Sequence, residues 1–222
     1  MGALDYAGGS VVHLNAGTAA LVTCLALGKR IGYGRENMLP QNLVLSVIRA
    51  SLLWVGWFGF NAGSAWAIAK KPSVLGMISG AVAGLVPITP ASGFVDPVGA
   101  LIISVTAGVV FYVAAVWMKK APRYDDSLDA WGVHDVGGAL GAVLTGAFAS
   151  SAINPAGKGW LNDGNIGQML IQVYDVGITF AYCAVGTFII LKLIDMIIGM
   201  HVSPEVGVDG LDINLRGETV HD

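Results

Sequence analysis

The chain consists of long apolar runs separated by short polar loops. About 20 consecutive apolar residues are needed for a helix to cross the hydrocarbon core of a bilayer. Six runs approach or exceed that length, at 5–28, 43–69, 72–88, 98–118, 130–151 and 168–199. The pattern predicts an all-α polytopic membrane protein over residues 1–200, followed by a polar tail at 201–222.

Composition agrees with this class. The chain is 55% hydrophobic and only 12% charged, whereas a soluble domain needs roughly a quarter of its residues charged. A net charge of −3 leaves no basic surface for nucleic acid. Cys24 and Cys183 lie inside apolar runs, so neither a disulfide framework nor a cysteine metal motif is indicated, and we expect both to be buried. We expect a lipid bilayer as the surroundings, no cofactor or metal, and no enzymatic activity.

The basic loops do not fit six spans. Lys and Arg of short loops are enriched on the cytoplasmic side, and they cluster here at 29–35, 70–71 and 119–123. If the first cluster is cytoplasmic, six spans place the other two outside. One more helix between Ala69 and Lys70 would place all three clusters in the cytoplasm. We therefore expect that a span is missing at this junction.

Small residues recur at helical spacing in "GMISGAVAG" and "GVHDVGGALGAVLTGAFA". In lipid, such patterns let helix backbones approach closely, because there is no hydrophobic drive for helices to associate. The apolar runs are therefore expected to form a packed bundle.

Two histidines lie in separate apolar runs. Ionisable residues inside a membrane usually face a pore or a partner, so His13 and His134 are predicted to form a pair. Two neutral imidazoles can share a proton and line an apolar channel for a small hydrogen-bonding molecule. The same pair could instead ligate haem iron, although Arg49 is the only arginine inside a span to hold haem propionates. His201 and His221 lie in the tail and are expected to be solvated.

The segment "LLWVGWFGFNAGSAW" is rich in aromatic residues. It suits an aromatic belt at the membrane interface. It equally suits a vestibule in which ring faces and the Ser64 hydroxyl receive a small cation. Asp5, before the first run, could cap backbone N–H groups or favour a nearby cation.

Five segments in this order resemble one family. They are "GALDYAGGSVVHLNAG", "GWFGFNAGS", "SGAVAGLVPITPASGFVDPVGA", "DDSLDAWGVHDVGG" and "GLDINLRGE". Together they cover nearly the whole chain and are similar to the bacterial-type branch of the ammonium transporter/methylammonium permease/Rhesus family. The resemblance implies a fold of eleven transmembrane helices, with two inverted five-helix repeats and a last helix, assembled as a homotrimer with one pore per subunit.

The resemblance also implies roles for single residues. His13 would lie in the fifth helix and His134 in the tenth, as the family's twin-histidine pair. Phe60 would be a gate phenylalanine, Trp57 and Ser64 would belong to the outer vestibule or pore wall, and Asp5 would be the acidic residue below the vestibule. Ammonium, or methylammonium as its analogue, would be deprotonated and pass as ammonia across the plasma (inner) membrane. A PII-type signalling protein would be a partner on the cytoplasmic face.

The departures from the family pattern leave alternatives open. The match begins at the family's fifth helix, and the helix expected between Ala69 and Lys70 is the family's seventh. Two single residues also differ: Arg49 replaces a small residue, and Asp135 follows His134 where glycine is usual. A carboxylate beside an imidazole favours its charged form. From the resemblance, the chain is expected to be a partial ammonium-transporter bundle that transports ammonium. The alternatives are a non-transporting remnant or subunit-interaction module and, more remotely, a haem-binding electron carrier.

Overall fold

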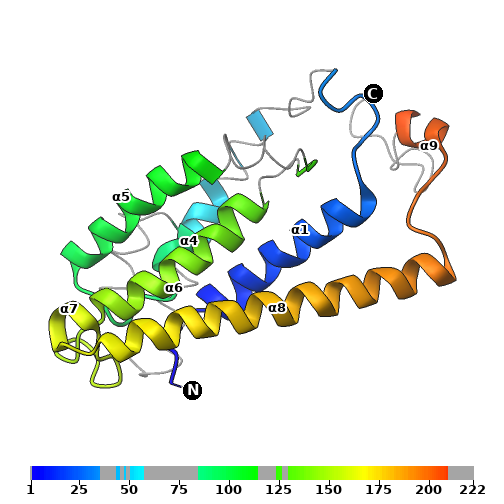
Figure 1. Ribbon diagram of the computed structural model, residues 1–222. Helices are drawn as coiled ribbons and strands as arrows, with labels where there is room; N and C mark the ends of the chain where they lie inside the picture. The colour runs from blue at the N-terminus through cyan, green and yellow to red at the C-terminus, as the bar shows by residue number, and fades with distance from the viewer. Residues whose placement is uncertain are drawn as a thin grey trace.

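The computed structural model describes residues 2–35, 44–45, 48, 51–57, 85–114, 124–126 and 130–209. The regular elements in these parts are helices, drawn as coiled ribbons in Figure 1, and the π-helical turns among them are named η1 and η3. The elements are η1 (Gly9–Leu14), α1 (Asn15–Leu27), α4 (Leu85–Ile88), α5 (Pro97–Val113), η3 (Trp131–Asp135), α6 (Val136–Phe148), α7 (Trp160–Asp163), α8 (Ile166–Ile197) and α9 (Pro204–Asp209).

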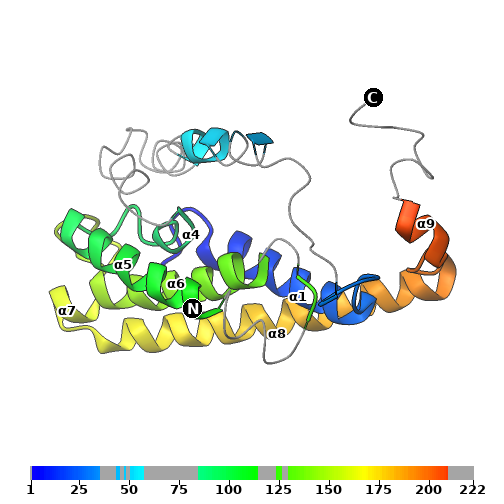
Figure 2. The ribbon, with the colours of Figure 1, turned by 90° about the horizontal axis from the view of Figure 1, so that it is seen from above.

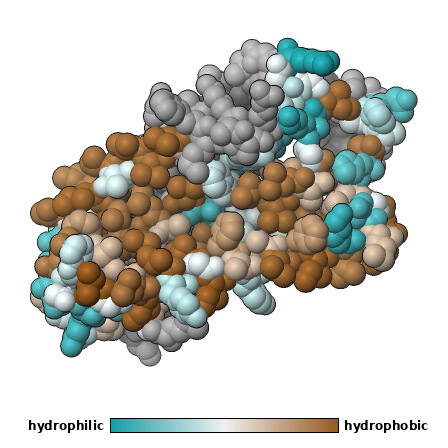
Figure 3. Space-filling model, in the orientation of Figure 1, coloured by the Kyte–Doolittle hydropathy of each residue, from teal (hydrophilic) through white to brown (hydrophobic). Residues whose placement is uncertain are grey.

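Two of the described helices are long and apolar enough to cross a membrane. They are the continuous helix Gly9–Leu27, formed by η1 and α1, and α8, with 19 and 32 residues. At 1.5 Å per residue these helices are about 28 Å and 48 Å long, against a hydrocarbon core of about 30 Å. Apolar side chains cover most of the surface along the helices, and hydrophilic ones gather towards the two ends (Figure 3). A polytopic membrane protein shows this distribution.

The predicted runs can be compared with the helices in four places. The helix Gly9–Leu27 lies within 5–28, α5 overlaps 98–118, η3 and α6 fill most of 130–151, and α8 covers most of 168–199. Of the runs at 43–69 and 72–88, the structure describes helical residues at 44–45, 48 and 51–57 and the four residues of α4. The junction between Ala69 and Lys70 lies outside the described residues.

The bundle is built around α6. On one side α6 packs on α4 and α5, and on the other side it packs on α8, which also runs along α1 (Figures 1 and 2). The apolar core between α4, α5 and α6 consists of Ile88, Ala91, Val95, Ala100 and Ile103, with Leu144 and Phe148 packed against it.

Glycines set the distance between these helices. A Cβ atom on Gly141 of α6 would lie 2.2 Å from the carbonyl oxygen of Pro87 in α4, closer than any non-bonded contact allows. The small-residue pattern of the sequence therefore corresponds to backbone-to-backbone packing.

Gln172 of α8 joins three parts of the chain. Its side chain is fully buried. The side-chain oxygen accepts a hydrogen bond from the backbone N–H of Leu4 at 2.7 Å, and the amide nitrogen donates to the carbonyl oxygens of Leu4 and Ala142, both at 2.8 Å. The Gln172 amide thus ties the segment before η1 to α6 and α8, and Nε2 of Gln168 adds a bond to the carbonyl oxygen of Gly2 at 2.9 Å.

The cysteines differ in burial. Cys183 of α8 is buried as expected, and its thiol donates to the carbonyl oxygen of Asn15 at 3.0 Å. Cys24 of α1 is only partly buried, because the outer face of α1 is open in the described part of the chain. Neither of these two thiols forms a disulfide.

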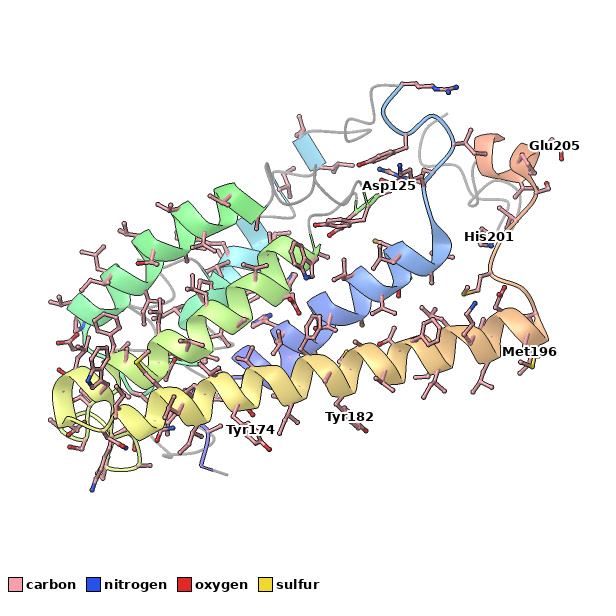
Figure 4. All side chains as sticks on the ribbon, in the orientation of Figure 1. Asp125, Tyr174, Tyr182, Met196, His201 and Glu205 are labelled. Carbon is pink, nitrogen blue, oxygen red and sulfur yellow. The ribbon has the colours of Figure 1, made fainter. Side chains whose placement is uncertain are left out.

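The loop after α1 is held by an ion pair. Asp125, whose side chain is 1% exposed, accepts hydrogen bonds from Nε of Arg30 at 2.8 Å and Nη2 at 2.6 Å, and from the Arg30 backbone N–H at 2.8 Å. This side-chain hydrogen bonding raises the pKa of Arg30 above its usual value. At the same end of the molecule, His201 bonds the carbonyl oxygen of Leu27 at 2.9 Å (labelled in Figure 4).

The loop between α6 and α8 depends on the carboxylate of Asp163. It accepts hydrogen bonds from the hydroxyl and the backbone N–H of Ser151, and from the backbone N–H of Gly159. The hydroxyl bond lowers the pKa of Asp163 below its usual value. A carboxyl whose pKa falls on folding stabilises the fold above its unfolded pKa of about 3.9, and this contribution is lost as the pH falls through the folded value.

We therefore expect Asp163→Asn to lower the melting temperature of the purified protein at pH 7. The difference from the unmodified protein should shrink as the pH falls below about 4. Thermal melts in detergent between pH 3 and pH 7 measure it. A difference that stayed constant over this range would show that ionisation of Asp163 does not matter.

Candidate functional site

The two predicted histidines meet in the interior. Nδ1 of His13 and Nδ1 of His134 are 3.1 Å apart, and the rings are nearly stacked, with centroids 5.3 Å apart and planes at 23°. His13 is 3% exposed, and His134 is partly buried. They come from different helices, 121 positions apart in sequence, so the fold itself brings them together.

Both histidines lie in π-helical turns. His13 is in η1 and His134 in η3, and each turn continues directly into an α-helix. In η1 the backbone N–H of His13 donates to the carbonyl oxygen of Gly8, five residues earlier, at 3.1 Å. Such turns are rare and are often found at functional sites. The apolar pattern did not predict them, because hydrophobic spacing does not distinguish a π turn from an α turn.

Glycine contacts on both sides fix the distance between the two histidine helices. A Cβ on Gly138 would lie 2.5 Å from the carbonyl oxygen of Gly9 and 3.3 Å from Cβ of His13. A Cβ on Gly17 would lie 2.3 Å from the backbone nitrogen of Asp135. The helices cross in backbone contact at these two places, and the histidine pair lies at the same crossing.

A nitrogen-to-nitrogen distance of 3.1 Å is that of a direct hydrogen bond. The two Nδ1 atoms occupy each other in this contact, so a metal ion cannot lie between them. The arrangement of His13 and His134 therefore does not fit haem ligation between the helices. One ring must donate the proton and the other accept it, so the two neutral rings adopt different tautomers.

Trp57 packs against the pair. Its ring stacks on His13 with centroids 5.2 Å apart and planes at 13°. Its Nε1–H donates to Oγ1 of Thr89 at 3.2 Å, and the Thr89 hydroxyl donates to the carbonyl oxygen of Leu85 at 2.7 Å. Sequence reasoning assigned no role to Thr89, although it lies in the motif "PITPASG".

Asp5 caps η1. Its two carboxylate oxygens accept hydrogen bonds from four successive backbone N–H groups, those of residues 8, 9, 10 and 11. The first N–H groups of a helix have no partner within the helix, and a carboxylate there satisfies them and favours the helix dipole. This geometry agrees with the capping interpretation of Asp5. The regular helix begins at Gly9, four residues later than the carboxylate.

Asp135 faces α1. It is 6% exposed and accepts a hydrogen bond from the hydroxyl of Thr18, which is itself fully buried. In the described part of the chain, this carboxylate is thus engaged by Thr18 on the neighbouring helix. Sequence reasoning expected a direct effect on the adjacent His134 and did not predict the threonine contact.

Three residues singled out in the sequence cannot be placed. Phe60, Ser64 and Arg49 lie outside the described residues. The structure therefore brings together His13, His134 and Trp57, and places Asp5 at the start of the helix that carries His13.

Comparison with known proteins identifies relatives of this arrangement. The protein-family model described as Ammonium Transporter Family matches residues 1–70 and 66–221. The chain is 37% identical over 250 aligned positions to an ammonium transporter of Bacillus subtilis, covering 100% of this chain and 61% of the relative. It is 39% identical to ammonium transporter Amt1 of Archaeoglobus fulgidus, covering 100% of this chain and 63% of the relative.

Solved structures show the same fold. The crystal structure of Saccharomyces cerevisiae Mep2 matches with a TM-score of 0.76 and 32% identity, over 92% of this chain and 54% of Mep2. The structure of a protein named Sensor Amt Protein matches with a TM-score of 0.77 and 25% identity, over 96% of this chain and 60% of that protein. The chain thus spans about six-tenths of the length of the curated relatives it matches. Two family-model matches that together run from residue 1 to residue 221 show that the chain belongs to the ammonium transporter family.

Proposed function

We propose that the protein moves ammonium or ammonia across a membrane, along a path lined by His13 and His134. The observation that carries this proposal is the direct Nδ1 to Nδ1 contact of two interior histidines from different membrane helices. Relatives over the whole chain are named ammonium transporters, which supports the substrate class.

The pair suits a small hydrogen-bonding molecule. Two neutral rings sharing one proton give a polar surface without fixed charge, along which ammonia can exchange hydrogen bonds. Because both Nδ1 atoms of a doubly protonated pair would be donors, the observed contact requires at least one neutral ring. We infer that an ammonium ion gives its proton to a neutral ring of the pair and continues as ammonia, and that the histidines carry that proton.

Uptake of labelled methylammonium into a transporter-deficient strain tests the proposal. We expect His13→Ala to reduce uptake to the level of cells that lack any transporter, because the partner His134 loses its hydrogen bond and the apolar path loses its polar surface. His201→Ala is the matched control, since His201 bonds Leu27 at the end of α1 and lies in the linker before α9. Equal uptake by His13→Ala and the unmodified chain, at equal amounts in the membrane, would contradict the proposal.

The finer features of the path follow the family resemblance. We propose that Trp57, Phe60 and Ser64 form the gate and vestibule, and that Asp5 holds the start of the histidine helix and favours a cation beside it. The stacking of Trp57 on His13 supports this for one of the three. The four backbone hydrogen bonds of Asp5 support its structural role.

The assembly and its surroundings are also proposals. We propose a homotrimer in the plasma (inner) membrane with the tail from residue 201 in the cytoplasm. A PII-type signalling protein is the proposed partner on that face. One structural relative is named a sensor, and this supports a regulatory contact in the family.

A second candidate function is that of a non-transporting remnant or subunit-interaction module. The family model matches in two pieces that meet at residues 66–70, where the basic loops also require another span. The alignment with the Bacillus subtilis relative has 250 positions, 28 more than the chain has residues, which is about the length of one membrane helix. A pore needs walls on all sides. If the unmodified chain is present in the membrane but takes up no methylammonium, this candidate is favoured.

A further inference from the structure

An acidic side chain in α8 lacks a partner within the described ranges. The 32 residues of α8 include three charged ones, namely Asp175, Lys192 and Asp195, and the 16 positions from 176 to 191 carry no charge. Asp175 therefore lies at one end of an uncharged stretch about 24 Å long. Its Oδ2 atom is buried and has no hydrogen-bond partner in the part of the chain that the structure describes.

An unpaired carboxylate in a membrane helix is unfavourable. Charged side chains within membrane helices are costly and rare, and they mark ion or proton sites. The bonds available from nearby backbone are already taken, because Asp5 accepts the free N–H groups at the start of η1. Oδ2 of Asp175 thus has no hydrogen-bond donor among the described residues.

Asp175 opens onto a cavity between η1 and α8. The cavity has a volume of about 490 Å³, and the described residues that line it include no basic one. Its polar lining residues all carry oxygen atoms, and they are Asp5, Ser10, Asn15, Asp175, Thr179 and Tyr182. Tyr182 projects outwards from α8 in Figure 4. Val11 and Ile178 complete the lining, so oxygen atoms form only part of it, and the one uncommitted carboxylate among them suits a cation.

Ser10 gives a second, independent indication. It is 4% exposed, and its hydroxyl has no hydrogen-bond partner among the described residues although it lines the same cavity. Buried hydroxyl groups are normally hydrogen-bonded, so one without a partner calls for a ligand or a water molecule. Ser10 of η1 and Asp175 of α8 thus line the same cavity, and each carries an oxygen without a partner among the described residues.

The charge of the site selects the class of cation. Calcium takes six to eight oxygen ligands, usually with several carboxylates, whereas Asp175 carries the one uncommitted carboxylate among the described lining residues. The volume also leaves room for several waters, each of which occupies about 30 Å³ in the liquid. We propose that this cavity binds a partly hydrated monovalent cation, held by Asp175 and Ser10. The site is separate from the histidine pair and does not require transport.

Thermal melting of the purified full chain in detergent tests the site. With choline chloride alone, Asp175→Asn is expected to melt at a higher temperature than the unmodified protein, because it removes an unpaired charge. Titration with sodium, potassium or ammonium chloride at constant ionic strength should raise the melting temperature of the unmodified protein in a saturable way. The rise should be absent in Asp175→Asn and weakened in Ser10→Ala.

Asp195→Asn is the matched control, because it removes the other carboxylate of α8, which does not line this cavity, and it should keep the full rise. The salt that saturates at the lowest concentration identifies the cation. The proposal is overturned if no salt gives a saturable rise, or if Asp175→Asn responds like the unmodified protein. A carboxylic acid band in the infrared spectrum at pH 7 that disappears in Asp175→Asn would also overturn it, because Asp175 would then be neutral.

Discussion

Replacing Gln172 with methionine is expected to lower the free energy of unfolding by about 2–4 kcal/mol, because each buried polar group left without a partner costs about 1–3 kcal/mol. Methionine keeps the length of the side chain and removes both the donor and the acceptor. The backbone N–H and the carbonyl oxygen of Leu4 would then lose the partners they have in the structure. The segment before η1 should then be held less tightly against α6 and α8, although the bond from Gln168 to Gly2 remains.

The measurement is thermal melting in detergent, where a loss of this size corresponds to a fall of roughly 5–15 °C. Tyr174→Phe is the control, because it removes a polar group from the same helix at a position that is 61% exposed (labelled in Figure 4). If the melting temperature of Gln172→Met fell by less than about two degrees, the hydrogen bonds of the amide would contribute little to stability.

Replacing Gly138 with valine is expected to separate the two histidine helices. Even the first added carbon would lie 2.5 Å from the carbonyl oxygen of Gly9 and 2.9 Å from the backbone nitrogen of Leu14. Backbone atoms cannot rotate away as a side chain can, so η1 must move. Overpacking of this kind costs about 1–3 kcal/mol or more, and it acts beside His13. Both the melting temperature and the uptake of methylammonium should fall.

Gly108→Val is the control for this substitution. Gly108 lies in α5, and a Cβ there would meet no atom of the described residues within 4 Å. Removing a glycine from a helix interior generally favours the helix, so Gly108→Val should leave stability and uptake unchanged or slightly improved. If the two valine variants behaved alike, close contact at Gly138 would not be what positions the histidines.

Four of the six apolar runs overlap helices of the described chain, because membrane helices must be long and apolar whatever their neighbours. The span limits themselves stay predictions. The histidine pair was also predictable in kind, since ionisable residues in apolar runs are rare enough to imply partners. The direct contact between His13 and His134 at 3.1 Å confirms that they are close. Their role in transport stays a prediction.

Other parts of the site were beyond sequence reasoning. The partners of Gln172, Asp135 and Trp57 lie 30 or more positions away in sequence, and local pattern carries no information about contacts at that separation. Gln172 and Gln168 were visible as amides in an apolar run, and that signal could have marked a buried hydrogen-bonding position. The role of Asp5 was left between two alternatives, because capping depends on the path of the turn from residue 5 to residue 9.

The π turn in η1 places one more residue in a helical turn than an α-helix holds. Each residue of an α-helix advances about 100° around the axis, so the turn shifts the angular phase of everything after it. In an uninterrupted α-helix, residues three or four positions apart lie on the same face. Across η1 such residues face different directions. Removal of one residue from η1 would restore a uniform phase and turn α1 by about 100° relative to His13. Gly17 would then no longer face Asp135, and the close crossing of the two histidine helices would be lost.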